Sequence, residues 1–122
     1  MPIPTVEIVT RPGEQLPSSL AKQLADSLGK ALGSEPGETW VRLFSLLAEH
    51  YAEGPGESGD FFPVFVTVLR AHLPAADILK DEVRRLTDVI AGLCDRPPEN
   101  VHLQYLPPGA CRVAFGGTLV PE

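Results

Sequence analysis

The sequence contains only two cysteines, Cys94 and Cys111, among its 122 residues. Two cysteines are too few for the disulfide framework of a small secreted domain, and their spacing is not the C-x-x-C of a zinc site. The three histidines, His50, His72 and His102, lack a paired spacing as well, so no residue is assigned to a metal. We therefore expect two reduced thiols in a cytoplasmic protein.

Long apolar runs and an excess of basic residues are also missing. No segment approaches the roughly 20 apolar residues that span a bilayer, and no basic stretch followed by an apolar run marks a signal peptide. Ten Lys and Arg stand against sixteen Asp and Glu, which gives a net charge of −6. Because phosphate groups attract basic surfaces, this balance argues against nucleic acid or a membrane as the partner.

The composition that remains is that of one globular domain. Hydrophobic residues make up 43 % of the chain and charged residues 21 %, which argues against a disordered protein. Thirteen prolines are scattered between well-patterned apolar segments. They therefore mark breaks between elements and do not form a polyproline ligand.

The apolar residues follow the spacing of a strand or a helix in six segments, and the pattern occurs twice. In chain order the sequence predicts a strand at 3–9, a helix at 15–32, a strand at 40–47, a strand at 63–70, a helix at 75–94 and a strand at 100–106. The strand at 40–47 is apolar apart from Arg42 and Ser45, so we expect it to be buried on both faces. Pro2 and Pro63, 61 residues apart, would open equivalent strands.

Each half is a β-α-β unit, in which a helix connects two parallel strands. Two such units predict an α/β domain with a four-stranded mixed sheet and both helices on one face. Within a single domain 1–122, we expect repeat one at 2–52, a connector at 53–61, repeat two at 62–110 and a C-terminal arm at 111–122. The arm would form a hairpin at Gly116-Gly117 that packs on a neighbouring subunit. No further helix is left to cover the second face of the sheet, so oligomerisation is expected to cover it.

Two charged segments are expected to be solvated. The connector 53–61 is acidic and rich in glycine, but it has no Lys and no following helix, so we expect a surface loop and not a phosphate-binding loop. Residues 80–85 carry several charges on a predicted helix and are expected to form its solvent-facing side.

The start Met1-Pro2-Ile3, the Leu-rich helix and the later run Thr39-Trp40-Val41-Arg42 make the chain similar to the tautomerase superfamily, typified by 4-oxalocrotonate tautomerase. The small members of that superfamily are single β-α-β units, so the double length resembles the cis-3-chloroacrylic acid dehalogenase subgroup. The resemblance covers nearly the whole chain. It implies a cofactor-free homotrimeric tautomerase that moves a proton on a small carboxylated keto–enol substrate.

The resemblance implies that Pro2, once Met1 is removed, is a catalytic amino-terminal proline. An ordinary α-amino group titrates near ~7.7–8.0, and an apolar pocket or neighbouring arginines would lower that pKa. The neutral secondary amine would then act as a general base. With Met1 attached, the nitrogen of Pro2 is an amide and cannot take up a proton in this way.

The resemblance also implies that arginines and a tyrosine hold the anionic substrate. Arg42 would act with Pro2 by binding and polarising carboxylate and carbonyl oxygens, for which its planar fork is suited; the alternative for Arg42 is a structural salt bridge, for example to Glu7. Arg70 would clamp a carboxylate. Arg11 lies one residue out of register with a substrate-binding arginine of the family, and Tyr105 would orient a substrate or a water.

Two departures from the family restrict the reaction. Ala114 and Leu28 stand where the dehalogenase subgroup has a water-activating glutamate and a histidine, which argues against hydrolytic dehalogenation. Three alternatives stay open: a non-catalytic trimeric protein of the same fold that binds a ligand or acts as a scaffold, a related hydratase or decarboxylase, and a ferredoxin-like regulatory module.

Overall fold

The computed structural model describes residues 1–55 and 61–122. Residues 56–60, which belong to the predicted connector, lie outside the described part. The elements in chain order are β1 (Ile3–Thr10), α1 (Leu20–Ala31), β2 (Arg42–Leu47), the 3₁₀ turn η1 (Ala48–His50), β3 (Val64–Leu69), α2 (Ala76–Cys94), the 3₁₀ turn η2 (Pro98–Asn100), β4 (Val101–Tyr105), β5 (Ala114–Phe115) and β6 (Thr118–Leu119).

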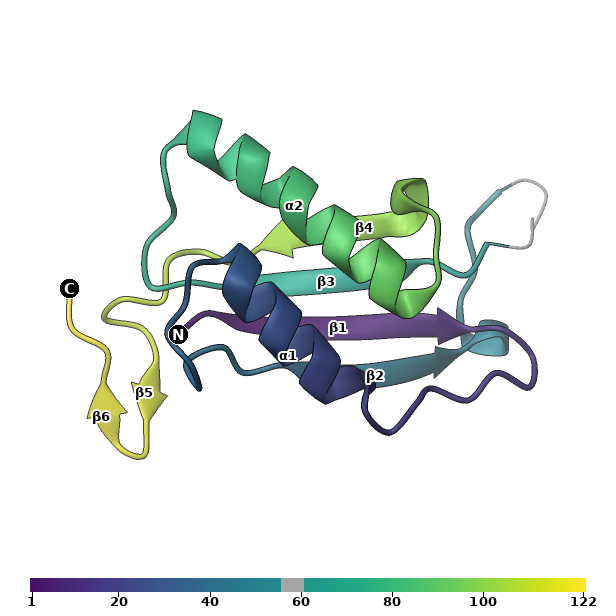
Figure 1. The fold of residues 1–122 in the computed structure, drawn as a ribbon, viewed down its shortest axis with the longest axis horizontal. Coiled ribbons are helices and arrows are strands. Elements are labelled where there is room, and N and C mark those ends of the chain that lie inside the picture. Colours follow the sequence, from purple (N-terminus) through teal and green to yellow (C-terminus); the bar gives the residue numbers. More distant parts are fainter. Residues whose placement is uncertain (56–60) are drawn as a thin grey trace.

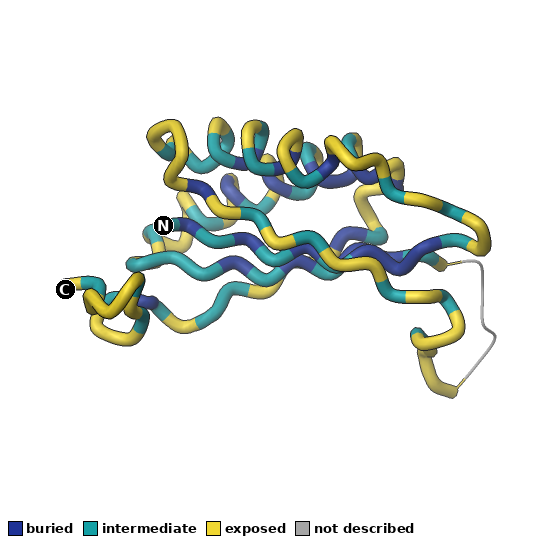
Figure 2. The backbone as a smooth tube through the Cα atoms, turned by 90° about the horizontal axis from the view of Figure 1, so that it is seen from below, coloured by how far each residue is buried: buried dark blue, intermediate teal, exposed yellow. Residues whose placement is uncertain are grey.

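Four strands form one mixed sheet in the order β2-β1-β3-β4, and a separate hairpin β5–β6 follows. The pairs β1–β2 and β3–β4 are parallel, whereas β1 and β3 are antiparallel. Both helices cover the same face of the sheet (Figures 1 and 2). The predicted arrangement of two β-α-β units in a four-stranded mixed sheet is confirmed.

The core lies between this face and the two helices. Along β1 and β3 the even-numbered residues point toward the helices, because successive side chains alternate between the faces of a strand. Leucines spaced by four residues on α1 and the matching stripe on α2 meet them. The largest fully buried side chains include Val6, Ile8, Leu20, Leu24, Leu28, Val64, Val66, Val68, Leu86 and Ile90.

The first helix is shorter than the predicted range 15–32. It begins at Leu20, after a turn in which the N–H of Leu20 donates to the carbonyl of Pro17 at 3.1 Å. A residue that precedes proline is disfavoured in the helical region, so Leu16 cannot continue the helix backward. The leucine spacing therefore begins one leucine, Leu16, before the start of the helix.

The prediction that the strand at 40–47 is buried on both faces is wrong. β2 is an edge strand of the sheet, and it is partly solvent-exposed along its whole length. Phe44 is 46 % exposed and Leu47 is 53 % exposed. An apolar run indicates that a strand can be buried, but the order of the strands in the sheet decides whether it is buried within the single chain.

The two halves are related by a shift of 60 residues in the strands, not by the 61 residues between the two strand-opening prolines. Thr5 pairs with Arg42 and Phe65 pairs with His102, so both members of the pair shift by 60. A shift of 61 would exchange the two faces of every strand, because the side-chain period is two. The two prolines are therefore not equivalent.

The second face of the sheet is open in the single chain (Figure 2). A shallow hollow of about 290 Å³ lies on it, lined by Thr5, Glu7, Phe44, Phe65 and Thr67. This face combines aromatic rings with polar groups, and neither helix packs against it.

The hairpin β5–β6 turns at the predicted Gly116-Gly117, whose φ angles are +57° and +89°. Two successive residues with positive φ form a tight hairpin turn, and glycine adopts them without steric conflict. Figure 1 shows the hairpin close to the N-terminus. The predicted packing of this hairpin on a neighbouring subunit stays a prediction.

Candidate functional site

Pro2 is buried at the start of β1. Its carbonyl oxygen accepts a hydrogen bond from the backbone N–H of Trp40 at 3.2 Å, which fixes the strand start to the segment that leads into β2. On the other side, Ile3 pairs with Leu69. The next step of the antiparallel register places Pro2 opposite Arg70.

Pro2 and Arg70 are opposed in the way that brings cross-strand side chains closest. The carbonyl of Arg70 points away from Pro2, because it accepts a 2.7 Å hydrogen bond from the N–H of Gly109 beyond β4. The carbonyl of Pro2 points the other way, toward Trp40. Opposed residues without mutual hydrogen bonds have Cα atoms about 4.5 Å apart. The ring of Pro2 therefore lies next to the Arg70 side chain, on the face that carries the helices.

A buried carboxylate from α2 joins Arg70 to Tyr105. Glu82 is only 3 % exposed; its Oε1 accepts a hydrogen bond from Nη1 of Arg70, and its Oε2 accepts one from the Tyr105 hydroxyl at 2.7 Å. Burial, followed by the hydrogen bond to Glu82, raises the pKa of Tyr105 above its ordinary value of 10.0. The hydroxyl therefore keeps its proton. Three of the predicted site residues, Pro2, Arg70 and Tyr105, thus lie in one region.

Glu82 was missed from the sequence, because residues 80–85 were expected to face solvent. The signal was present in the helix spacing: Glu82 lies four residues before Leu86 and eight before Ile90, in the stripe that packs on the sheet. A charged residue at a core position needs a partner. An acid in an apolar stripe therefore points to a cation or hydroxyl within its reach, and here these are the partly buried Arg70 and Tyr105.

Apolar groups surround the amino-terminal residues. The Met1 Cε lies 3.0 Å from where a Cβ on Gly109 would stand, and Cδ1 of Leu69 lies 3.2 Å from the same point. The absence of a side chain at Gly109 therefore leaves the space that Met1 fills. Nearby, the rings of Trp40 and Phe115 meet edge to face, with centroids 5.0 Å apart.

Arg42 is not brought next to Pro2 within one chain. It lies opposite Thr5 on the open face of the sheet, and its guanidinium carbon lies 5.4 Å from the centre of the Phe44 ring. Pro2 belongs to the helix-covered face. The alternative salt bridge to Glu7 is not formed either, and among residues 1–55 and 61–122 Arg42 makes no ion pair.

Arg11 lies at the far end of β1 from Pro2. Arg11 lies nine steps along the extended chain from Pro2, a span of roughly 30 Å. Arg11 pairs there with Glu14 at 3.2 Å and with Asp95 at 3.7 Å. Within one chain, Arg11 therefore cannot reach a molecule bound at Pro2.

The same end of the sheet holds Arg96, a buried arginine that the sequence pattern did not indicate. Its side chain is 1 % exposed and binds both carboxylate oxygens of Glu14, at 2.7 and 3.1 Å. It also donates to the carbonyls of Val9 at 2.9 Å and Phe62 at 2.7 Å. The hydrogen bond from Arg96 is the main reason that the pKa of Glu14 is lowered. Every described partner of Arg96 is a fixed group of the fold, so we assign it a structural role.

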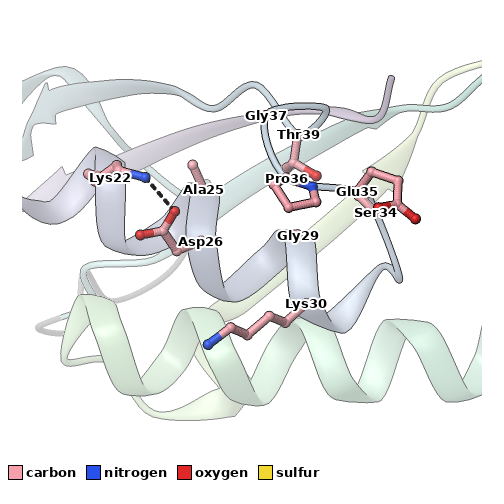
Figure 3. Close-up of a pocket in the computed structure, with 10 residues that line it drawn as sticks. All are labelled: Lys22, Ala25, Asp26, Gly29, Lys30, Ser34, Glu35, Pro36, Gly37 and Thr39. Carbon is pink, nitrogen blue, oxygen red and sulfur yellow. Dashed lines mark hydrogen bonds and ion pairs between the residues drawn. The ribbon is translucent and has the colours of Figure 1, made fainter.

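A cavity of about 410 Å³ lies between α1 and residues 34–39, and none of the predicted site residues lines it. Figure 3 shows Lys22 and Asp26 turned toward each other on its wall, where they form an ion pair at 2.6 Å. The Lys30 side chain extends away from residues 34–39. The hydroxyl of Thr39 is buried without a hydrogen-bond partner in the described part of the chain. Of the charged side chains that line the cavity, Lys22 and Asp26 pair with each other, whereas Lys30 and Glu35 form no ion pair within residues 1–55 and 61–122.

Solved structures of the same architecture include several proteins of related kinds. The macrophage migration inhibitory factor of Trichinella spiralis superposes with a TM-score of 0.74 at 14 % identity, over 96 % of this chain and 98 % of that chain. The inhibitory factor of Oncomelania hupensis gives 0.72 at 22 % identity, over 98 % and 82 %. A fused 4-OT, solved as an asymmetric trimer, gives 0.73 at 18 % identity, over 94 % of each chain.

The chain has the tautomerase fold. No family model and no curated protein sequence matches it, so the likeness rests on structure. In this tautomerase fold the helix-covered region at the start of β1 brings together Pro2, Arg70, Glu82 and Tyr105.

Two other kinds of feature concern residues 1–55 and 61–122, namely a membrane-spanning helix and a metal-binding group. Neither helix there combines the length and the apolar character that crossing a membrane requires. In the same ranges, no three His, Cys, Asp or Glu side chains come together in a group that could hold a metal ion.

Proposed function

We propose that this chain is a cofactor-free tautomerase, acting in the cytoplasm, that moves a proton on a small carboxylated keto–enol substrate. The observation that carries the proposal is the place of Pro2: the buried start of β1, on the tautomerase fold, beside the Arg70 side chain. A freed amine there would lie next to a cation that binds carboxylates and that disfavours the protonated amine.

The base in this reaction is the amine of Pro2 after Met1 has been removed. Burial and the adjacent positive charge of Arg70 both lower the pKa of such an amine, so more of it is neutral at physiological pH. The neutral amine takes a proton from one atom of the enol system and returns it to another. Removal of Met1 would also vacate the space beside Leu69 and Gly109 that its side chain fills.

Arg70 binds the substrate carboxylate. Its side chain is 23 % exposed, and within the described residues only Nη1 is engaged, by Glu82. The remaining N–H donors of the guanidinium fit a carboxylate as a planar fork. Tyr105 contributes to the same region through its bond to Glu82.

Arg42 and Arg11 enter the proposal as residues from neighbouring subunits of a homotrimer. Each is too far from Pro2, or on the wrong face, to act in its own chain. The uncovered sheet face and the exposed edge strand β2 support an assembly, and the fused 4-OT of the same fold was solved as a trimer. A shared site would give both arginines a place near the substrate.

The experiment compares the wild type with Pro2→Ala in the ketonisation of phenylenolpyruvate and of 2-hydroxymuconate. Because general base catalysis typically contributes 10²–10⁴-fold, we expect kcat to fall by about 10²-fold or more. Pro4→Ala is the matched control: Pro4 is buried on the same face of β1 but can never carry a free amine. It should retain most of the activity, and equal rates for the wild type and Pro2→Ala would refute the proposal.

A covalent probe tests the amine directly. A solved structure of the same fold, with a TM-score of 0.74 at 15 % identity, is that of a protein inactivated by 2-oxo-3-pentynoate. A neutral amine adds to the triple bond of this compound, so the protein gains the mass of one reagent. We expect the adduct on the amino-terminal peptide of the wild type, and an adduct elsewhere in the chain would contradict the assignment.

A non-catalytic ligand-binding protein of the same fold is the second candidate. It is favoured by the packing of Met1, whose side chain fills the space next to Leu69 and Gly109. Intact-mass measurement on protein from its native host separates the two, because retained Met1 leaves the Pro2 nitrogen an amide. Complete retention of Met1 would favour ligand binding over catalysis.

A further inference from the structure

We propose that Glu82 is a positioning residue of the Pro2 region, which holds the Arg70 guanidinium where a substrate carboxylate meets it. The inference rests on the proposed function for its substrate class, a small carboxylate. The role assigned to Glu82 acts on binding, so it can be tested apart from catalysis.

Glu82 lies in a part of α2 where an acid is costly. It occupies a core position in the stripe that contains Leu86 and Ile90, and it is 3 % exposed. A carboxylate in such a place loses its hydration, and it is retained only with partners that make up for the loss. A leucine at this position would pack without that penalty. The presence of an acid at this core position is therefore explained by its partners, Arg70 and Tyr105, more than by the packing of the helix.

Glu82 uses its two carboxylate oxygens for two different partners. Oε1 accepts a hydrogen bond from Arg70, which follows β3, and Oε2 accepts one from the hydroxyl of Tyr105 at the end of β4. One carboxylate thus sets the positions of two side chains from two strands. A guanidinium held at one edge keeps a fixed direction for its other N–H donors, which a flexible arginine would lack.

Tyr105 also acts through Glu82. Its hydroxyl has one proton, and that proton is donated to Glu82 at 2.7 Å. The same hydroxyl cannot donate to a substrate at the same time. Tyr105 therefore acts by holding the second oxygen of Glu82, which stops the carboxylate from turning away from Arg70.

The neighbouring charges on α2 do not share this role. Asp81 is exposed and pairs with Arg85 at 3.0 Å, one turn along the helix. Arg85 also donates to the carbonyl of Ala31 at 2.7 Å. Asp81 thus offers a control: it has the same charge, in the same turn of α2, without contact to Arg70 or Tyr105 among its described ion pairs and hydrogen bonds.

The test measures the affinity for cinnamate, a carboxylate that cannot tautomerise, and for methyl cinnamate, its uncharged methyl ester. The ratio of the two dissociation constants is the carboxylate preference, read from Trp40 fluorescence. A change in packing alone weakens both ligands, whereas a displaced Arg70 weakens only cinnamate. We expect Glu82→Gln to lower the preference by about ten-fold or more, as a misplaced binding group does, and Asp81→Asn to leave it unchanged.

Tyr105→Phe keeps the ion pair and removes one hydrogen bond, so the preference should fall in the same direction by a smaller factor. Circular dichroism establishes that each variant is folded, and if Glu82→Gln does not fold, Tyr105→Phe decides. A preference that is unchanged or increased, or an equal loss of both ligands, overturns the inference. The turnover of phenylenolpyruvate is measured with the same variants. If neither the wild type nor any variant turns it over, but the carboxylate preference still depends on Glu82, the proposed tautomerase activity is refuted and the positioning role of Glu82 is supported.

Discussion

Replacing Arg96 with methionine removes a buried cation while keeping most of its apolar stem. The variant leaves the Glu14 carboxylate without its main partner and leaves the carbonyls of Val9 and Phe62 without the donors that reach them at 2.9 and 2.7 Å. These groups come from β1, the loop that follows it and the chain that enters β3. The substitution therefore disconnects three segments at one point.

The size of the effect follows from burial. Removing one partner of a buried ion pair costs about 3–5 kcal/mol, because the other charge stays behind without compensation. The Arg96 side chain is 1 % exposed, but that of Glu14 is 21 % exposed, so water can partly solvate the remaining carboxylate. We therefore expect the free energy of unfolding to fall by about 3 kcal/mol, the lower end of that range.

The assay is urea unfolding at one protein concentration, with Arg11→Met as the matched control. Arg11 also pairs with Glu14, but its side chain is 40 % exposed, and exposed pairs contribute about 0–1 kcal/mol. A fixed concentration is needed because association would stabilise the folded state by mass action. If Arg96→Met unfolds within about 1 kcal/mol of the wild type, the network does not have the structural role assigned to it.

The pH dependence provides a second check on the same residues. The pKa of Glu14 is lowered from its ordinary value of 4.5, mainly by the hydrogen bond from Arg96. A carboxyl group whose folded-state pKa is depressed stabilises the fold above its unfolded pKa, and this contribution is lost as the pH falls through the folded-state pKa. The stability gap between the wild type and Arg96→Met should therefore narrow below about pH 4.5. A gap that stays constant to lower pH would contradict the pairing.

Two further predictions concern single positions. Gly92 lies inside α2, and a Cβ added there would meet no atom within 4 Å apart from the adjacent residues and the helix's own backbone, so Gly92→Ala should raise the free energy of unfolding by about 0.5–1 kcal/mol. Gly29→Ala, whose Cβ would lie 3.3 Å from Oγ1 of Thr39, should gain less in the same urea titration. Burial raises the pKa of the Cys94 thiol to about 11, so iodoacetamide at about pH 8 should alkylate the exposed Cys111 and spare Cys94 in the folded protein. Equal labelling of the two thiols, seen by peptide mass spectrometry, would contradict the burial of Cys94.

The fold was accessible from the sequence because its signals are local. Strand and helix periods depend on neighbouring residues, and the repetition of β-α-β fixed the sheet. What depends on the sheet order was not accessible: the apolar run at β2 is compatible with a central strand or an edge strand, and only the position of β1 decides. The one-residue error in matching Pro2 to Pro63 has a related cause. A proline indicates the start of a strand only to within a residue or so, whereas the alternation of side chains requires an even number of residues between equivalent strand positions.

The candidate site was accessible in part for the same reason. Pro2 and Arg70 were indicated by the resemblance to the tautomerase superfamily, and the antiparallel register of β1 and β3 brings them together. Glu82 did not stand out, because a helix with many charges hides one acid that faces inward. Arg96 lies between Cys94 and Pro97, where the chain has no period from which burial could be predicted.

The exposed edge strand β2 also bears on colloidal behaviour. Its sequence, Arg-Leu-Phe-Ser-Leu-Leu, contains a single charge, and a free edge presents unpaired backbone groups to any passing strand. Short β-forming segments without charge or proline are the ones that stack between molecules. Arg42 places a charge at the first residue of this segment. Independently of any contact with a ligand, that charge disfavours edge-to-edge pairing of β2 strands from many molecules. A neutral side chain at position 42 would leave this exposed edge without that charge.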